Sequence, residues 1–384
     1  MGVWDVDRLV AEVRRLSLRG MRREEFHQEL AARIRRAVPI DATCWHGLDP
    51  RTLMLTSANP VELLAGGFMT LENQPAAAWS VLASEYERDD HNTFASIARR
   101  RAPVGILGES TRGRPERSAR YREFLAPHGT PFELRAAFVS RGRAWGCVVF
   151  HRTAATGDFT HREAGVVARL SRPIAEGLRA SIRLDAARRC DNDAAPGLVL
   201  LGRRDEVELV TPPARALLDD LAGESSSRPH KVPLPLPSLA AVARHHARGI
   251  PDRAAPSMDV PTRAGWVSLH ASVPDGAGSD RVAIVIQRAA PEAAIALELE
   301  AYGLTDRERE VAGLAVRGFS TVALAEQLHL SPWTIQDHFK SIFEKTGTRS
   351  RRQLRALVFF EEYLPAINAR RPLDAKGSLT RAGG

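Results

Sequence analysis

Four side chains near the carboxyl end of the 384-residue sequence share one face of a predicted helix over residues 332–346. They are Trp333, Gln336, Asp337 and Lys340. Their spacing of three or four residues places them side by side on a helix. Glutamine pairs with adenine, aspartate accepts from the N4 amino group of cytosine, and lysine donates to guanine. The pattern therefore predicts a helix that contacts base edges in the major groove of DNA, which admits one α-helix.

The opposite face of this helix is apolar, and we expect it to dock on a hydrophobic core. Its members are Ile335, Phe339, Ile342 and Thr346. Ser331 is suited to cap the helix, and Pro332 fits the first helical position, where a missing N–H costs nothing. Two side chains have an alternative role: Trp333 could cover the edge of the core, and His338 could pack or bond to the backbone.

Basic side chains cluster around the same helix. Residues 340–355 contain six lysine or arginine residues and one acidic residue, Glu344. The DNA phosphate backbone attracts such a cluster, and the N–H groups at a helix start can also hold a phosphate. The net charge of +8 for the whole chain is weaker evidence. All but four of the 54 basic residues are arginine, so a compositional bias explains this charge equally well.

Capping signals outline four short helices over residues 303–364, preceded by a helical connector at 290–302. The predicted fourth helix, residues 350–364, is more apolar than one core face requires, so we expect a homodimer formed through it. The capping residues are Thr305 with Glu308, Ser320, Ser331, and Ser350 with Gln353, and the terminating glycines are Gly318 and Gly347.

The segment LTDREREVAGLAVRGFSTVALAEQLHLSPWTIQDHFKSIFEKTGTRSRRQL, which begins at Leu304, resembles the LuxR-type (NarL/FixJ-type) helix-turn-helix domain. The resemblance implies a transcription regulator that binds double-stranded DNA as a homodimer, and it allows RNA polymerase as a further partner. The matching features are the opening LT-x-RERE-V, Gly318-x-Ser320, Ala325, Ser331-x-x-Thr334-Ile335, His338, Ile342, Lys345 and Gly347.

The same resemblance assigns roles to single residues. Many members have a lysine in place of Gln336, and an asparagine is common in place of Thr321, so those two contacts do not transfer directly. Positions that face bases in the family fall on Gln336, Asp337 and Lys340. Positions near phosphates fall on Ser331, Thr334, His338, Arg349, Ser350, Arg351 and Arg352.

The front of the chain predicts a sensor domain over residues 1–190. Two amphipathic helices lead into a hairpin with Asp49-Pro50 as its turn, and two later strands meet at Arg141-Gly142. A long helix then begins with the capping-box pattern of Thr160 and Glu163. This order of elements, with WGCV at residues 145–148 and FT-x-x-E at 159–163, is similar to a GAF-type α/β sensor domain.

Residues 191–289 resemble a PAS-like α+β domain. A hairpin, a short helix and two late strands are predicted, with GESSSRPHKVPLPLPS at residues 223–238 as a loop. The polar tail at 365–384 is expected to be flexible. The predicted fold class is therefore multidomain α+β, with a GAF-like α/β sensor, a PAS-like middle domain and an all-α four-helix C-terminal domain.

Either front fold can hold a small-molecule effector in an apolar cavity. Each candidate for such a cavity could equally be plain core. The candidates are Cys44, Trp45, Phe94, Tyr121 and Trp145. No cofactor is predicted. The histidines lack the spacing of a metal site and are expected on the surface: His230, His245, His246 and His270.

Several classes are disfavoured. The three cysteines, Cys44, Cys147 and Cys190, are far apart, which argues against a disulfide framework and suits the cytoplasm. No apolar run approaches the roughly 18 residues of a membrane span. No GxxxxGK[ST] motif occurs, which argues against a nucleotide-binding phosphate loop. Residues 1–150 contain no lysine, which argues against a phosphorylated receiver domain.

Three alternatives remain beside DNA-dependent regulation. The GAF-like domain could be a thiol reductase that uses Cys44 or Cys147, although the apolar strands around both cysteines favour inert packing, so we predict no enzyme activity. A sigma-factor-like role would need a second promoter-binding region, which is not visible. The four helices could also form an ordinary helical subdomain with a solvated basic face.

Overall fold

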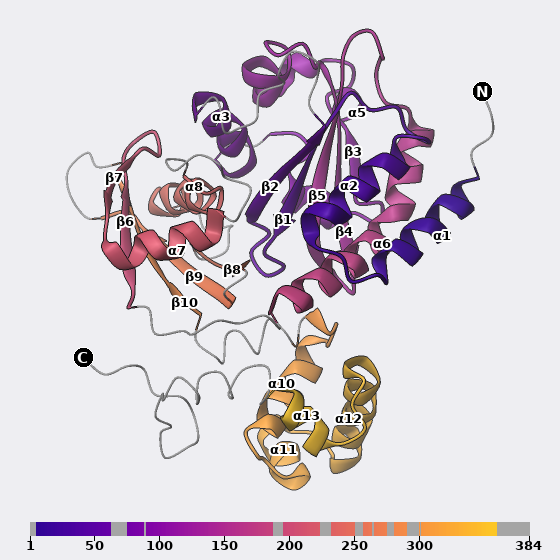
Figure 1. Ribbon diagram of the computed structural model, residues 1–384, viewed down its shortest axis with the longest axis vertical. Helices are drawn as coiled ribbons and strands as arrows, with labels where there is room; N and C mark the ends of the chain where they lie inside the picture. The colour runs from indigo at the N-terminus through magenta and orange to yellow at the C-terminus, as the bar shows by residue number, and fades with distance from the viewer. Residues whose placement is uncertain are drawn as a thin grey trace. The chain divides into compact units, whose positions relative to one another are not determined.

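The computed structural model describes residues 5–62, 75–87, 90–186, 195–222, 232–249, 256–262, 265–274, 280–289, 299 and 301–358. In these ranges the chain forms two antiparallel five-stranded sheets with helices, and a helical C-terminal region (Figure 1). The predicted multidomain α+β class is confirmed. None of the helices within these ranges is long and apolar enough to cross a membrane.

The first sheet has the strand order β2-β1-β5-β4-β3 and contains both predicted hairpins. Arg141 and Gly142 form the β4–β5 turn with φ angles of 53° and 75°, a left-handed conformation that suits a two-residue hairpin turn. In the β1–β2 turn, the Asp49 carboxylate accepts the Arg51 N–H at 2.8 Å. The strands are β1 (Ala42–Leu48), β2 (Leu55–Glu62), β3 (Val104–Ile106), β4 (Phe132–Ser140) and β5 (Arg143–Arg152).

Three helices, α1, α2 and α6, pack on one face of the first sheet (Figure 1). The Ser171 hydroxyl of α6 donates to the carbonyl of Ala137 in β4 at 2.8 Å. The His27 ring of α2 stacks on Trp45 of β1 with 5.1 Å between the ring centroids. These contacts fix the sheet against its helices. The three helices are α1 (Val6–Ser17), α2 (Arg23–Ile34) and α6 (His161–Ala186).

Shorter elements cover the other face of this sheet. The Phe94 ring at the start of α4 lies 4.5 Å from the guanidinium carbon of Arg135 in β4. The Tyr86 hydroxyl at the end of α3 accepts the Leu55 N–H at 2.8 Å. These elements are α3 (Pro75–Tyr86), α4 (Phe94–Ala98), α5 (Leu107–Ser110), a 3-10 turn (Pro115–Arg117) and a π-helical turn (Tyr121–Leu125).

The second sheet has the order β7-β6-β10-β9-β8 and includes the predicted β6–β7 hairpin. In that hairpin Leu200 lies opposite Leu209. The elements are β6 (Gly197–Leu201), β7 (Val207–Val210), β8 (Ser257–Thr262), β9 (Gly265–Ser272) and β10 (Val282–Arg288), with α7 (Pro212–Ala222) and α8 (Pro235–Ala247).

Two expectations for this region were wrong, and one strand was not predicted. Strand β8 contains Pro261 and lies at the edge of the sheet, where a missing N–H is tolerated. Residues 235–238 were predicted as loop but form the first turn of α8, where prolines cost no helix hydrogen bond. His245, expected on the surface, is 8% exposed in α8. His230 lies outside the described residues.

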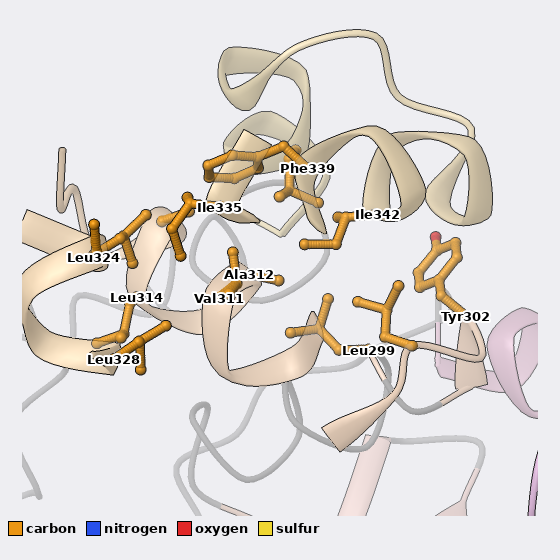
Figure 2. Close-up of a cluster of buried hydrophobic side chains, with 14 residues drawn as sticks. Leu299, Tyr302, Val311, Ala312, Leu314, Leu324, Leu328, Ile335, Phe339 and Ile342 are labelled. Carbon is orange, nitrogen blue, oxygen red and sulfur yellow. The ribbon is translucent and has the colours of Figure 1, made fainter. Parts of the chain in front are cut away.

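The C-terminal helices enclose a hydrophobic core of their own (Figure 2). Leu299 and Tyr302 of the predicted connector belong to this core. Parts of three predicted segments lie outside the described residues, namely 290–298 and 300 of the connector, 359–364 of the fourth helix and the tail 365–384. The helices are α10 (Asp306–Val316), α11 (Thr321–Leu328), α12 (Pro332–Thr346) and α13 (Arg351–Val358).

Candidate nucleic-acid interface

Helix α12 begins and ends at its predicted capping residues. The Ser331 hydroxyl accepts the Thr334 N–H at 3.0 Å, and Pro332 is the first helical residue. Gly347 ends the helix with a φ of 69°, a conformation that favours glycine. These local interactions set the length of α12 independently of the rest of the chain.

One face of α12 is buried in the core of the C-terminal helices (Figure 2). Ile335 and Ile342 are 0% exposed and Phe339 is 2% exposed. Burial of each such side chain stabilises the domain by about 1.5–3 kcal/mol. The helix is therefore held by this face, and its opposite side is directed outward.

The four side chains predicted to contact bases all lie on that outward side, which we name the outer face of α12. Trp333 is 74% exposed, and Gln336, Asp337 and Lys340 are exposed. Within the described part of the chain, none of the four side chains takes part in a hydrogen bond or ion pair. The outer face thus presents an amide, a carboxylate, an ammonium group and an aromatic ring to solvent.

A buried carboxylate joins α12 to α10. Both Glu308 oxygens lie 2.6 Å from the Lys345 ammonium nitrogen, and Oε1 accepts the Ser341 hydroxyl at 2.6 Å. Burial alone would raise the pKa of Glu308, but the hydrogen bonds from Lys345 and Ser341 outweigh it and lower the pKa to about 2. Glu308 also closes the predicted capping box with Thr305. The sequence indicated only the capping box, because the partner residues on α12 are more than thirty positions away.

Arg351, predicted to contact a phosphate, is half-buried and interacts with neighbouring helices. Its guanidinium donates to the Phe319 carbonyl and, at 3.2 Å, to the Thr321 hydroxyl. The guanidinium carbon lies 4.7 Å from the centroid of the Phe339 ring. Arg351 therefore links α13 to the start of α11 and to the buried side of α12.

The other predicted phosphate contacts are more accessible. Arg349 and Arg352 are exposed, and His338 is half-buried at the flank of α12. The Ser350 hydroxyl accepts the Gln353 N–H at 3.2 Å, as the capping pattern predicted. The exposed members of the set lie at the two ends of α12 and at the start of α13.

The five candidate pocket residues of the front domain are not brought together. Cys44 and Trp45 are consecutive in β1, so their side chains lie on opposite faces of the sheet. Trp45 is stacked between His27 and Phe138, with 5.1 and 5.5 Å between ring centroids. Strand alternation was the signal that could have separated these neighbours at the outset.

The remaining candidates are divided in the same way. The Trp145 ring lies 5.5 Å from the guanidinium carbon of Arg179 in α6, on the face of the sheet that α6 covers. Phe94 lies on the other face, against Arg135. Tyr121 packs on the small cluster of Leu107, Phe124 and Leu125.

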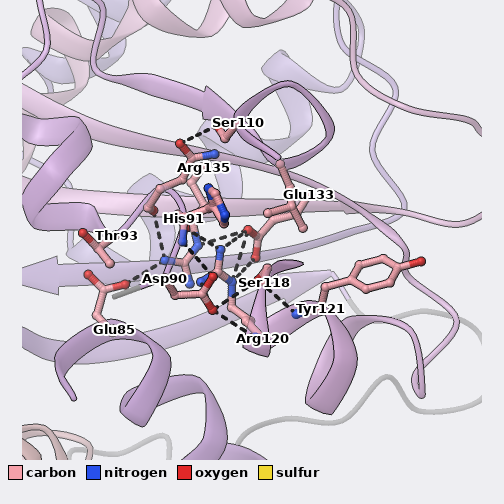
Figure 3. A network of polar contacts seen from close by, with 12 residues as sticks. Glu85, Asp90, His91, Thr93, Ser110, Ser118, Arg120, Tyr121, Glu133 and Arg135 are labelled. Atoms are coloured by element: carbon pink, nitrogen blue, oxygen red, sulfur yellow. Dashed lines mark hydrogen bonds and ion pairs between the residues drawn. The ribbon is translucent and has the colours of Figure 1, made fainter. Parts of the chain in front are cut away.

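A buried ionic network on the α3–α5 face was not predicted (Figure 3). Arg120 donates to the two carboxylate oxygens of Glu133 at 2.7 and 3.0 Å, and Asp90 lies 3.6 Å from another of its nitrogens. Arg135 donates to Glu85 at 2.7 Å. These five side chains are each 1–2% exposed. Phe94 thus lies beside two members of this network, since its ring contacts Arg135 and its N–H donates to Glu85 at 2.6 Å.

The network shifts the ionisation of its central carboxylate. Burial alone would raise the pKa of Glu133, but the charges of Arg120 and Arg135 outweigh it and lower the pKa to about 2. A signal was present in the sequence, since Glu133 and Arg135 alternate with Leu134 and Ala136 in a predicted strand. Charged residues at period two in a strand must share one face.

The thiol chemistry considered from the sequence gains no support from the surroundings of Cys147. This side chain is buried, and burial raises the pKa of its thiol well above the usual value. A thiolate nucleophile needs the opposite shift. Cys44 is half-buried, and Cys190 lies outside the described residues.

Comparisons with known proteins agree with this geometry at the C-terminal end. Residues 303–358 match the family described as Bacterial regulatory proteins, luxR family. No curated protein matches the chain. The match and the exposed, well-anchored α12 identify residues 303–358 as a LuxR-family helix-turn-helix DNA-binding domain.

Two solved structures are similar to larger parts of the chain. A bacteriophytochrome from the photosynthetic bacterium R. palustris shares 10% identity at a TM-score of 0.31, with 74% of this chain and 62% of that chain covered. The sensor region of a sensor histidine kinase shares 15% identity at a TM-score of 0.18, with 69% and 90% covered. This chain therefore spans 62% of the length of the bacteriophytochrome.

Proposed function

We propose that the protein is a sequence-specific regulator of transcription that inserts α12 into the major groove of double-stranded DNA. The observation that supports this most is the division of α12 into two faces. Ile335, Phe339 and Ile342 fix the helix in its core, while the outer face offers four side chains that no described residue engages. A helix presented in this way matches the width and chemistry of the groove.

The phosphate contacts would come from around α12. The N–H groups at its start, with Ser331 and Thr334, form a local anion site by the general behaviour of helix ends. Arg349 and Arg352 are exposed and would contact the backbone of the same duplex, with His338 and Ser350 at the margins. Arg351 would act indirectly, because its guanidinium is engaged within the domain.

The front of the chain would sense an effector or partner through the GAF-like and PAS-like domains. Leu299 and Tyr302 support a route for the signal, because they place the end of the connector inside the DNA-binding core. A homodimer formed through residues 350–364 would present two copies of α12 to a pseudo-palindromic site. Sedimentation of the protein with and without DNA tests the dimer, and a monomer under both conditions would contradict it.

Selection of bound fragments from a random duplex pool tests the proposal directly. We expect enrichment of one motif, with affinity that falls steeply as salt rises. Gln336→Ala and Lys340→Ala should each weaken binding to that motif by about 1–3 kcal/mol. Gln327→Ala is a matched control, since Gln327 is an exposed glutamine on α11. Equal binding to all duplexes, or equal effects of the variants and the control, would contradict the proposal.

A further inference from the structure

Asp337 is an acidic residue at the centre of a surface proposed to enter DNA. It is exposed on the outer face of α12, one turn after Trp333 and three residues before Lys340. Within the described residues its carboxylate makes no ion pair and no hydrogen bond. The carboxylate is therefore hydrated in the protein alone, and it must exchange that water for another partner when α12 enters the groove.

Among the described contacts, no basic group of α12 or α13 pairs with Asp337. Lys345 is committed to Glu308, with 2.6 Å to each carboxylate oxygen. The guanidinium of Arg351 faces the Phe319 carbonyl and the Phe339 ring. Lys340 is not paired with Asp337 among the described contacts. The charge of Asp337 is thus uncompensated on the side that faces DNA.

In the major groove only two base groups can donate to a carboxylate, the N4 amino group of cytosine and the N6 amino group of adenine. Guanine and thymine present acceptors there, so a carboxylate beside them is desolvated and unpaired, which is costly. The two donors also differ from each other. Adenine has the acceptor N7 beside its amino group, whereas cytosine has a C5–H, so a carboxylate is repelled less by cytosine.

We propose that Asp337 is a specificity-determining residue that acts mainly by exclusion. It admits operators with a cytosine amino group opposite it, and it rejects duplexes that place guanine or thymine there. It also lowers affinity for non-specific DNA, because a negative charge approaches the phosphate backbone. This inference rests on the proposed function of α12 and adds the base that one position of the operator must contain.

The test uses the full chain and synthetic duplexes of the motif that the unmodified protein selects. We expect one cytosine in each half-site whose replacement by guanine or thymine weakens binding by about 10-fold or more. Replacing that C·G pair with a U·A pair, which exchanges the amino donor for a carbonyl acceptor and adds no methyl group, should have a similar effect. Asp337→Ala should lose this discrimination and bind non-specific duplexes more tightly. Asp337→Asn should shift the preferred base to adenine, which asparagine recognises.

Glu344→Gln is the control for charge alone, because Glu344 is an exposed acid two turns further along α12. It should change affinity for all duplexes by a similar factor and leave their ratios unchanged. Unaltered ratios in Asp337→Ala, or a motif in which the uracil replacement has no effect, would overturn the inference. If Gln336→Ala and Lys340→Ala still weaken binding in that case, the proposed function survives without it. If the unmodified protein selects no motif, the proposed function itself fails.

Discussion

The Lys345 ammonium nitrogen lies 2.6 Å from both carboxylate oxygens of Glu308, and this ion pair fixes α12 to α10. The two side chains are 20% and 6% exposed. An ion pair that is largely withdrawn from water is strongly destabilising to break, because removal of one partner leaves the other charge uncompensated. The orientation of the outer face of α12 therefore depends on a contact made by a residue outside that face.

Glu308→Gln should destabilise the C-terminal helices by about 2–3 kcal/mol, since it removes the ion pair and weakens the capping box with Thr305. Urea unfolding monitored by circular dichroism measures the loss. Glu310→Gln is the control, because its pair with Arg307 is exposed, at 38% and 49% of the two side chains, and such pairs contribute little. Equal losses in the two variants would show that the Glu308 contact has no special role.

Acid should destabilise the protein through two carboxylates. The pKa values of Glu308 and Glu133 are lowered from 4.5 to about 2 in the folded chain. The unfolded chain therefore binds protons on these groups at higher pH than the folded chain does, so their contribution is present above pH 4.5 and is lost as the pH falls toward 2. As the pH is lowered from 4.5 toward 2, the free energy of unfolding should fall less steeply for Glu308→Gln than for the unmodified protein.

Arg351 and Arg352 are adjacent but should respond differently to substitution. Arg351→Lys should destabilise the domain by about 1–2 kcal/mol, because lysine cannot reproduce the forked hydrogen bonds and the stacking on Phe339. Arg352→Ala should leave stability nearly unchanged, since the side chain is exposed, while it weakens binding to every duplex and lowers the salt dependence. Thermal unfolding and binding at several salt concentrations separate the two roles. A lower salt dependence in Arg351→Met, which unlike Arg351→Lys also removes the charge, would assign the phosphate contact to Arg351.

The buried network of the first sheet should be sensitive to loss of one charge. Arg135→Met removes the partner of Glu85 and leaves Glu133 with Arg120 alone, which should cost about 3–5 kcal/mol. Arg172→Met is the control, because Arg172 pairs with Glu176 at the surface, with 76% and 43% exposure, and should change stability by about 0.5 kcal/mol or less. Near-ultraviolet circular dichroism during heating reports the loss. An unchanged transition in Arg135→Met would contradict the expected cost.

Local signals in the sequence predicted the elements that position the candidate site. The bounds of α12 follow from Ser331, Pro332 and Gly347, whose effects act within one helical turn. The start of α6 follows in the same way from Thr160, whose N–H donates to Glu163 at 2.8 Å. Caps and turns depend on neighbouring residues, so a single sequence contains the information needed to find them.

Contacts between distant residues could not be predicted in this way. Glu308 and Lys345 are 37 positions apart, and Glu85 and Arg135 are 50 positions apart. Each of these residues is of a charged type that is usually found on the surface. Only the packing of separate elements gives it a buried partner. The contacts of Arg351 within the domain could not be predicted for the same reason, since its partners Phe319 and Thr321 lie some thirty residues earlier.

Leu299 is 2% exposed within the core of the C-terminal helices. This burial anchors the end of the connector in the helical bundle. A force that acts on residue 299 has two outcomes. It rotates the whole helical bundle as one body, or it extracts a leucine at a cost of about 2–3 kcal/mol. A weak force therefore reorients α12 together with the bundle and leaves the bundle intact. Only a force that supplies the free energy needed to extract Leu299 changes the structure of the bundle itself.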